Sequence, residues 1–251
     1  MSKQYANPPI IEAVCEFRFT PDTPWDLTVP GLVYEKIKDK FPQKEQRTVQ
    51  EIEIKQTPQG IQQEVRTFDR VLFLENTRKM LVQLGPRVLA VNSLKPYPGW
   101  EKFEVAIREA FEALTTIVEV KGLQRIGLRY INQIEIPEPS VELEDYFDFY
   151  LFTGPRLPQE MSSFIAGCEF PYENNRDKSR VQLKNFSNGA DGKVLLRLDI
   201  DYFLAQPKGI EIGEAMNWVE TAHDRVEEIF EGCITDRLRG LFGGGKQNAG
   251  R

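Results

Sequence analysis

The stretch RLDID places two carboxylates and a guanidinium on one face of a predicted strand. Arg197, Asp199 and Asp201 alternate with Leu198 and Ile200, and this period of two is typical of a strand with one polar face. Carboxylates at i and i+2 lie about 6–7 Å apart at their Cα atoms, so they could share a divalent cation or act as an acid and a base. No third ligand follows at a recognisable spacing, and cross-strand ion pairs with arginines are the simpler prediction.

The stretch EIEIK at residues 51–55 repeats the same alternation. Glu51, Glu53 and Lys55 share one face of a predicted strand, which needs no catalytic explanation if that face is solvated. The pattern also resembles the opening signature of the tunnel-shaped triphosphate hydrolases, in which paired carboxylates hold a metal ion and the lysine holds phosphate. In that family the signature lies close to the N-terminus and later strands carry inward charged residues, whereas here fifty residues precede it and the later strands do not match. A solvated strand face is therefore preferred, with metal-dependent triphosphate hydrolysis as an alternative.

Other familiar catalytic patterns are missing from the sequence. His223 is the single histidine, and it has no serine, cysteine or second histidine at catalytic or metal-ligand spacing. Cys15, Cys168 and Cys233 are far apart and flanked by apolar residues, so we expect buried free thiols. No phosphate-binding loop, dinucleotide fingerprint or Gly-x-Ser-x-Gly motif occurs. We therefore expect no catalytic residues, no bound metal and no cofactor.

The composition is that of a globular protein with an acidic balance. The 251 residues are 41% hydrophobic and 28% charged, with a net charge of −6. No apolar run reaches the roughly 20 residues of a membrane span, and the N-terminus does not have the pattern of a signal peptide, so we expect no membrane association and a cytoplasmic location. The negative charge argues against nucleic-acid binding, except at one local basic patch made of Arg176, Lys178, Arg180 and Lys184.

Hydrophobic periodicity predicts alternating groups of strands and helices. Helices are expected over 29–41, 99–117 and 214–241, with a weaker one over 142–152. The second of these carries an apolar stripe of Phe103, Ile107, Phe111 and Leu114. The expected strands cover 13–19, 49–56, 61–76, 79–92, 125–136, 162–170, 179–186 and 193–204.

These elements suggest that the chain repeats one unit of strand, helix, three strands and helix. Arg18 in EFRF and Arg129 in GLRY occupy equivalent points of the opening strands, and Phe111 and Phe230 align in the closing helices. The prediction is an α+β protein of antiparallel sheets with helices on one face. Its first half covers 1–120, its second half covers 121–242 and packs against the first, and a glycine-rich tail, 243–251, is expected to be disordered.

Two sequence blocks carry a resemblance to a known family. They are YANPPIIEAVCEFRF at the N-terminus and RIGLRYINQIEI in the centre, and together they resemble a sporadically distributed family of prokaryotic proteins of similar length with no assigned activity. The resemblance covers nearly the whole chain. It implies company with mobile or defence-associated genes, including CRISPR-type systems, and implies no chemistry. Its markers are Asn7, Pro8, Pro9, Ile10, Glu12, Ala13, Glu16, Arg125, Gly127, Leu128, Arg129, Tyr130 and Asn132.

The sequence therefore favours binding over catalysis. We expect a non-enzymatic adaptor or sensor subunit that binds another protein, and the alternative is a module that binds an anionic small molecule between sheet and helices. If the opening strands adjoin, Arg18 and Arg129 each require a carboxylate partner, because a half-buried guanidinium without one is costly. The candidate binding residues are Glu12, Glu16, Arg18, Arg125, Arg129, Tyr130, Arg197, Asp199 and Asp201.

Overall fold

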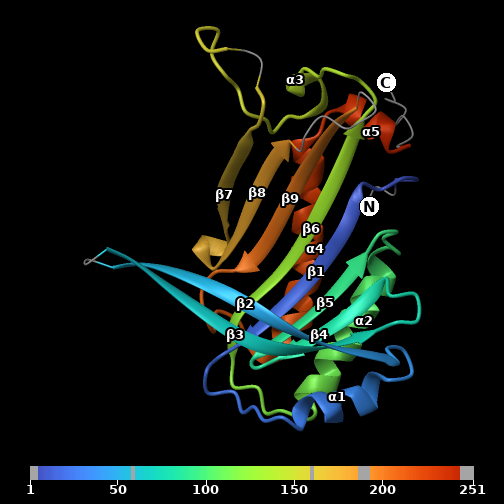
Figure 1. Ribbon diagram of the computed structural model, residues 1–251, viewed down its shortest axis with the longest axis vertical. Helices are drawn as coiled ribbons and strands as arrows, with labels where there is room; N and C mark the ends of the chain where they lie inside the picture. The colour runs from blue at the N-terminus through green and yellow to red at the C-terminus, as the bar shows by residue number, and fades with distance from the viewer. Residues whose placement is uncertain (1–4, 58–59, 159–160, 186–192, 244–251) are drawn as a thin grey trace.

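Nine strands form one antiparallel sheet in the order β2-β3-β4-β5-β1-β6-β9-β8-β7 (Figure 1). The computed structural model describes residues 5–57, 60–158, 161–185 and 193–243, and over residues 49–68 it describes the backbone alone. The expected disordered tail lies outside the described residues, apart from Gly243. The strands are β1 Ile10–Phe19, β2 Gln43–Thr57, β3 Gly60–Leu74, β4 Met80–Gly85, β5 Val88–Leu94, β6 Leu123–Ile136, β7 Ile165–Tyr172, β8 Asp177–Asn185 and β9 Val194–Leu204.

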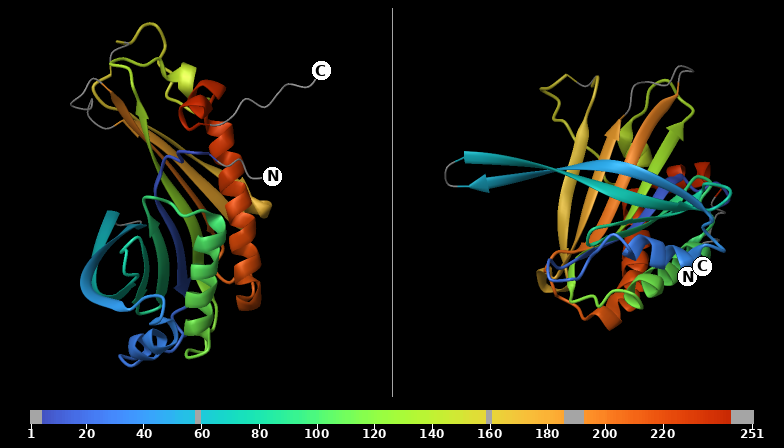
Figure 2. Two further views of the ribbon diagram at one scale, coloured as in Figure 1. Left: turned by 90° about the vertical axis from the view of Figure 1, so that its right-hand side faces the viewer. Right: turned by 60° about the horizontal axis from the view of Figure 1, so that its bottom comes forward.

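The longer helices lie on one face of this sheet, as predicted (Figure 2). Helix α2 packs on β5 and helix α4 on β6 and β9, while α1 packs against α2. All four residues of the predicted apolar stripe of α2 are buried. Two short helices and two single turns of 3₁₀ helix complete the described structure. The bounds are α1 Val29–Ile37, α2 Trp100–Thr115, α3 Leu143–Tyr146, η1 Glu173–Asn175, η2 Ile212–Glu214, α4 Ala215–Cys233 and α5 Asp236–Leu241.

Predicted helices end early at three places. The helix expected over 29–41 ends at Ile37. The expected helix over 214–241 is interrupted at Ile234, which is extended and forms an isolated bridge with Phe147. Thr235 then caps α5, because its side chain accepts a hydrogen bond from the backbone of Leu238. The weak helix expected over 142–152 is one turn, Leu143–Tyr146.

The α+β class is confirmed, whereas the internal duplication is not. The opening strands β1 and β6 are neighbours at the centre of the sheet, with Arg18 opposite Arg125 and Val14 opposite Arg129. The first half, however, has one strand more than predicted, because the stretch 79–92 folds as the hairpin β4–β5, with Arg87 at φ 60° in its turn. The nine strands form one continuous sheet across the predicted boundary at residue 120.

Alternation along the central strands separates an apolar face from a polar one. Ala13, Cys15 and Phe17 on β1, together with Leu128 on β6 and Ile200 on β9, are fully buried in the core under the helices. The residues between them point to the other face. The β2–β3 ribbon bends away from its neighbours and curls on this other side of the sheet, opposite α2 and α4 (Figure 2). No described helix is long and apolar enough to cross a membrane.

Candidate anion-binding groove

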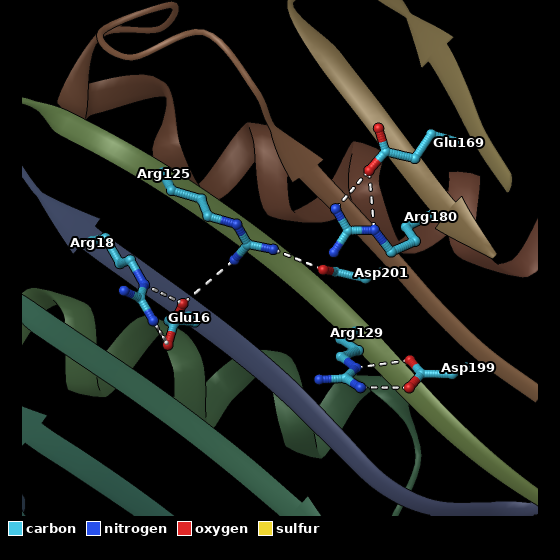
Figure 3. A network of polar contacts seen from close by, with 8 residues as sticks. All are labelled: Glu16, Arg18, Arg125, Arg129, Glu169, Arg180, Asp199 and Asp201. Atoms are coloured by element: carbon cyan, nitrogen blue, oxygen red, sulfur yellow. Dashed lines mark hydrogen bonds and ion pairs between the residues drawn. The ribbon is translucent and has the colours of Figure 1, made fainter. Parts of the chain in front are cut away.

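The polar face of the central strands holds a groove of about 720 Å³. Strands β1, β6 and β9 form its floor, and β7 and β8 contribute charged side chains (Figure 3). The groove is lined by Val14, Glu16, Arg18, Gln124, Arg125, Gly127, Arg129, Glu169, Lys178, Arg180, Asp201, Phe203, Leu204, Ala205 and Pro207. The volume is within the range of small-molecule sites, which is about 300–1,000 Å³.

Glu16 lies among three arginines at one end of the network. Arg18 donates from Nε to Glu16 Oε1 at 2.7 Å, and Arg125 donates from Nη1 to the same oxygen at 3.4 Å. Arg70, which is almost fully buried on β3, adds a third positive charge nearby. Burial alone would raise the pKa of Glu16, but the Arg18 hydrogen bond and the three guanidinium charges outweigh burial and lower this pKa. The cluster therefore has an excess of positive charge.

Arg125 bridges Glu16 and Asp201 by lying flat over Gly127. Its Nη2 donates to Asp201 Oδ1 at 3.0 Å and to Oδ2 at 2.8 Å, and its guanidinium carbon is 4.9 Å from the ring centre of Phe203. A Cβ atom at residue 127 would lie 2.5 Å from Arg125 Nη1. Glycine at this position is therefore what allows the guanidinium to lie between the two carboxylates.

Asp201 differs from Glu16 in its protonation behaviour. Burial raises the pKa of Asp201, although the charges of Arg125 and Arg129 act in the opposite direction. Asp199, on the same face of β9, accepts both hydrogen bonds of a forked pair from Arg129, with Nε to Oδ1 at 2.7 Å. The predicted ion pairing of this strand with arginines is present in the structure.

Cations outnumber carboxylates along the groove. Its lining contains five cationic side chains, from Arg18, Arg125, Arg129, Lys178 and Arg180, and three carboxylates, from Glu16, Glu169 and Asp201, while Asp199, the partner of Arg129, adds a fourth carboxylate beside the lining. This local excess occurs in a protein with a net charge of −6.

Two of these arginines have donor capacity left over. Arg180 uses Nε and Nη2 on a single oxygen of Glu169, at 3.0 and 2.6 Å, and Arg129 uses Nε and Nη2 on Asp199. Within the described residues, no hydrogen bond uses Nη1 of Arg129 or of Arg180. An anion in the groove would find these donors available.

Four of the predicted site residues are not in the groove lining, and one of them, Asp199, is joined to it by the ion pair with Arg129. Tyr130 is on the helix-covered face, where its hydroxyl is 3.0 Å from Tyr97 Oη and 3.3 Å from His223 Nδ1. Glu12 accepts a hydrogen bond from Asn92 Nδ2 at 2.7 Å, and in the described part of the chain no ion pair joins it to an arginine. Arg197 shares the polar face but pairs in register with Lys184, beyond the groove lining.

The predicted basic patch is divided between this groove and its surroundings. Lys178 and Arg180 line the groove, and Lys184 lies further along the same face of β8. Arg176 instead donates to Asp177 at the end of β8, with Nη2 2.6 Å from Oδ2. The patch therefore contributes two of its four cations to the candidate site.

Four contributors to the site were missed from the sequence. Phe203 continues the alternation of Asp199 and Asp201 by one more step, so its place on the polar face could have been predicted. Glu169 enters through the β7–β8 hairpin, where it lies opposite Arg180, so this contact could have been predicted from the hairpin. Arg70 on β3 approaches Glu16 on β1 from a distant segment, which the sequence alone does not reveal. Gly127 was noted as a family marker, but its role depends on where the Arg125 side chain lies.

The other sequence motifs do not add a reactive group to the groove. His223 stacks on Trp100 with ring centres 3.9 Å apart, consistent with the predicted packing role. The cysteines are free thiols, and Cys15 and Cys233 are buried whereas Cys168 is partly exposed. Burial raises the pKa of Cys15 well above its usual range and that of Cys233 to about 12.

The sequence offered two possible metal sites, one at residues 51–55 and one at Asp199 and Asp201. The side chains of Glu51, Glu53 and Lys55 lie outside the described residues, and their strand pairs with β3. Among the described residues, no three His, Cys, Asp or Glu side chains form a group that could hold a metal ion.

The chain was compared with protein families, curated proteins and solved structures. No family model matches the chain, and no curated protein or solved structure matches it.

Proposed function

We propose that the protein is a binding protein for an anionic small molecule, which it holds in the groove on the polar face of the sheet. The observation that carries this proposal is the excess of cationic side chains over carboxylates along the groove. Guanidinium groups bind phosphate and carboxylate groups through two parallel hydrogen bonds. Arg129 and Arg180 are half exposed and each retains an Nη1 donor with no hydrogen bond to the described residues.

The existing ion pairs hold the arginines in position before a ligand arrives. Arg125 is fixed by Glu16, Asp201 and Phe203, so little side-chain entropy would be lost on binding. The half-buried setting also makes each charge interaction stronger than it would be in bulk water. Binding without turnover fits the absence of an activated thiol and the packed state of His223.

A thermal-shift panel tests this proposal. Inorganic phosphate, pyrophosphate, citrate and AMP would be compared at constant ionic strength, because surface charge effects depend on salt. A ligand at about 100 times its Kd should stabilise the protein by about 2.7 kcal/mol. We expect at least one of these anions to raise the melting temperature of the wild type and to have a smaller effect on Arg129→Gln. A flat response to all four anions would contradict the proposal.

An adaptor role is the second candidate, and it rests on a different observation. Edge strand β7 and the segment before it expose large apolar side chains, namely Phe152, Leu157, Ile165 and Phe170, as interaction surfaces often do. A pull-down from the native host that recovers the same partner with the wild type, but not with Ile165→Glu, would favour this role. A loss of capture that instead follows Arg129→Gln would assign the interaction to the groove.

The remaining sequence-based expectations stay proposals. The resemblance to the prokaryotic family rests on two blocks that lie side by side on β1 and β6, and it is the sole support for a defence-associated context. A cytoplasmic location is likewise proposed from the sequence. Triphosphate hydrolysis at Glu51, Glu53 and Lys55 would require metal-dependent release of phosphate, and a variant with all three changed to alanine would test it.

A further inference from the structure

A second hollow lies on the helix-covered side of the sheet, away from the groove. It has a volume of about 580 Å³. Met80 on β4 and Ser93 on β5 are direct cross-strand neighbours and line it. The other contributors are Lys40 after α1, the β3–β4 turn, the loop before α2 and the first turns of α2. They are Lys40, Glu75, Thr77, Lys79, Pro96, Pro98, Glu101, Lys102 and Val105.

The hollow combines apolar surface with positive charge. Met80, Pro96, Pro98 and Val105 supply the apolar surface, and Val105 is 43% exposed although it is a large hydrophobic residue. Three lysines stand around it. Lys40 pairs with Glu109 at 2.9 Å, whereas the ammonium groups of Lys79 and Lys102 have no ion pair within the described residues.

The start of α2 adds to this charge. No side chain caps the helix at Gly99, so the first backbone N–H groups of a 16-residue helix lack a side-chain acceptor. The lining also holds two carboxylates: Glu101 lies in the first turn of α2, and Glu75 accepts a hydrogen bond from Thr77 Oγ1 at 3.0 Å. An anion would therefore bind through the ammonium groups of Lys79 and Lys102, and not through a net positive charge of the hollow.

Ser93 provides an independent indication of a ligand. Its side chain is 1% exposed, and its Oγ has no hydrogen-bond partner within the described structure. Leaving a buried hydroxyl unpaired costs about 1–3 kcal/mol. A serine hydroxyl rotates freely about one torsion, so a polar group that enters beside Met80 could restore the missing hydrogen bond.

We propose that this hollow binds a small amphipathic carboxylate, with its apolar body against Met80, Pro96 and Val105. The carboxylate would lie between Lys79, Lys102 and Ser93, and it would accept a hydrogen bond from Ser93 Oγ. An uncharged or cationic ligand of the same size would lack the ion pairs with the lysines. This site is separate from the groove and does not depend on the function proposed for it.

Isothermal titration with defined probes tests the assignment. The full chain would be titrated with hexanoate, 1-hexanol, hexylamine and acetate. We expect hexanoate to bind more tightly than the other three, since it alone combines the apolar body with the negative charge. The double variant Lys79→Met/Lys102→Met should weaken hexanoate by about tenfold or more, corresponding to the loss of a charged hydrogen bond. Val105→Asp should have an effect of similar size.

Matched controls separate this site from other causes. Lys121→Met, which removes a lysine paired with Glu119 elsewhere, and Arg129→Gln in the groove should both leave hexanoate binding unchanged. Circular dichroism would establish that the lysine and Val105 variants are folded. The proposal is overturned if hexanoate binds no better than 1-hexanol, or if folded Lys79→Met/Lys102→Met binds it like the wild type.

Discussion

The two faces of the sheet differ in how their buried carboxylates are paired. On the helix-covered face, Asp177 is fully buried, and its carboxylate accepts hydrogen bonds from Arg176, Tyr202 and Trp218, with Trp218 Nε1 at 3.0 Å. On the polar face, Arg129 is the one hydrogen-bond donor to Asp199 among the described side chains, and that arginine is 47% exposed. The closed network on the first face stabilises the fold, whereas the pairs on the second remain accessible to a ligand. Alternate residues of the same strands therefore differ in whether their charges are closed off in the core or open to solvent.

Removing a carboxylate from each face should give the largest contrast. Asp177→Ala leaves the buried partners unsatisfied and should destabilise the protein by about 3–5 kcal/mol. Asp199→Ala leaves a half-exposed arginine that water can solvate, and should cost about 1 kcal/mol or less. Chemical denaturation of both variants provides the measurement. Equal losses of unfolding free energy would show that the two faces do not differ in this way.

Gly127 allows the polar face to be perturbed with little effect on the core. The Cβ atom of Gly127→Ala would collide with the Arg125 guanidinium, which is the flexible end of a side chain and can move. We expect anion affinity to fall by about tenfold, because Arg125 loses its position, while stability changes by about 1 kcal/mol or less. Gly167→Ala on β7 is the matched control, since its nearest contact would be an ordinary 3.6 Å. A similar loss of affinity in both variants would contradict the assigned role.

Tyr130 tests the opposite face of the same strand. Tyr130→Phe removes the hydroxyl that lies 3.0 Å from Tyr97 Oη and 3.3 Å from His223 Nδ1. The unfolding free energy should fall by about 1 kcal/mol, which is the value of an ordinary hydrogen bond. Anion titration of this variant should match the wild type. If Tyr130→Phe bound the anion more weakly than the wild type, residues of the helix-covered face would also contribute to the groove.

The pH dependence of stability should have opposite signs at Glu16 and Asp201. The pKa of Glu16 is lowered in the folded protein, so its ionised form adds stability above the unfolded pKa of about 4.3, and this is lost as pH falls through the folded pKa. The pKa of Asp201 is raised by burial, so its contribution falls as pH rises from about 3.9 through the folded value.

The comparison is made with Glu16→Gln and Asp201→Asn, measured by denaturation between about pH 3 and pH 7. The advantage of the wild type over Glu16→Gln should grow with rising pH, whereas its advantage over Asp201→Asn should shrink. Slopes of the same sign would show that the two carboxylates do not differ in environment. The effect is the smallest of those predicted here because arginines partly offset the burial of Asp201.

The sequence predicts those parts of the fold that depend on local pattern. The apolar stripe of α2 and the alternation along β6 and β9 follow from periods of 3.6 and two, and these placed Arg125, Arg129, Asp199 and Asp201 on one polar face. The order of the strands in the sheet depends on contacts between distant segments, so the approach of Arg70 on β3 to Glu16 on β1 could not be derived. The break between α4 and α5 depends on the bridge from Ile234 to Phe147, which has no local signal.

Titration of pyrophosphate into the wild type, Arg125→Gln and Arg108→Gln at constant ionic strength shows whether the polar face of the sheet binds an anion. Arg108 is a suitable control because its ion pairs lie on the helices, with Glu104 and Glu220. We expect measurable binding to the wild type and to Arg108→Gln, and binding to Arg125→Gln that is weaker by about tenfold or more. No heat with the wild type, or equal affinity for Arg125→Gln and Arg108→Gln, would contradict an anion site on the polar face of the sheet.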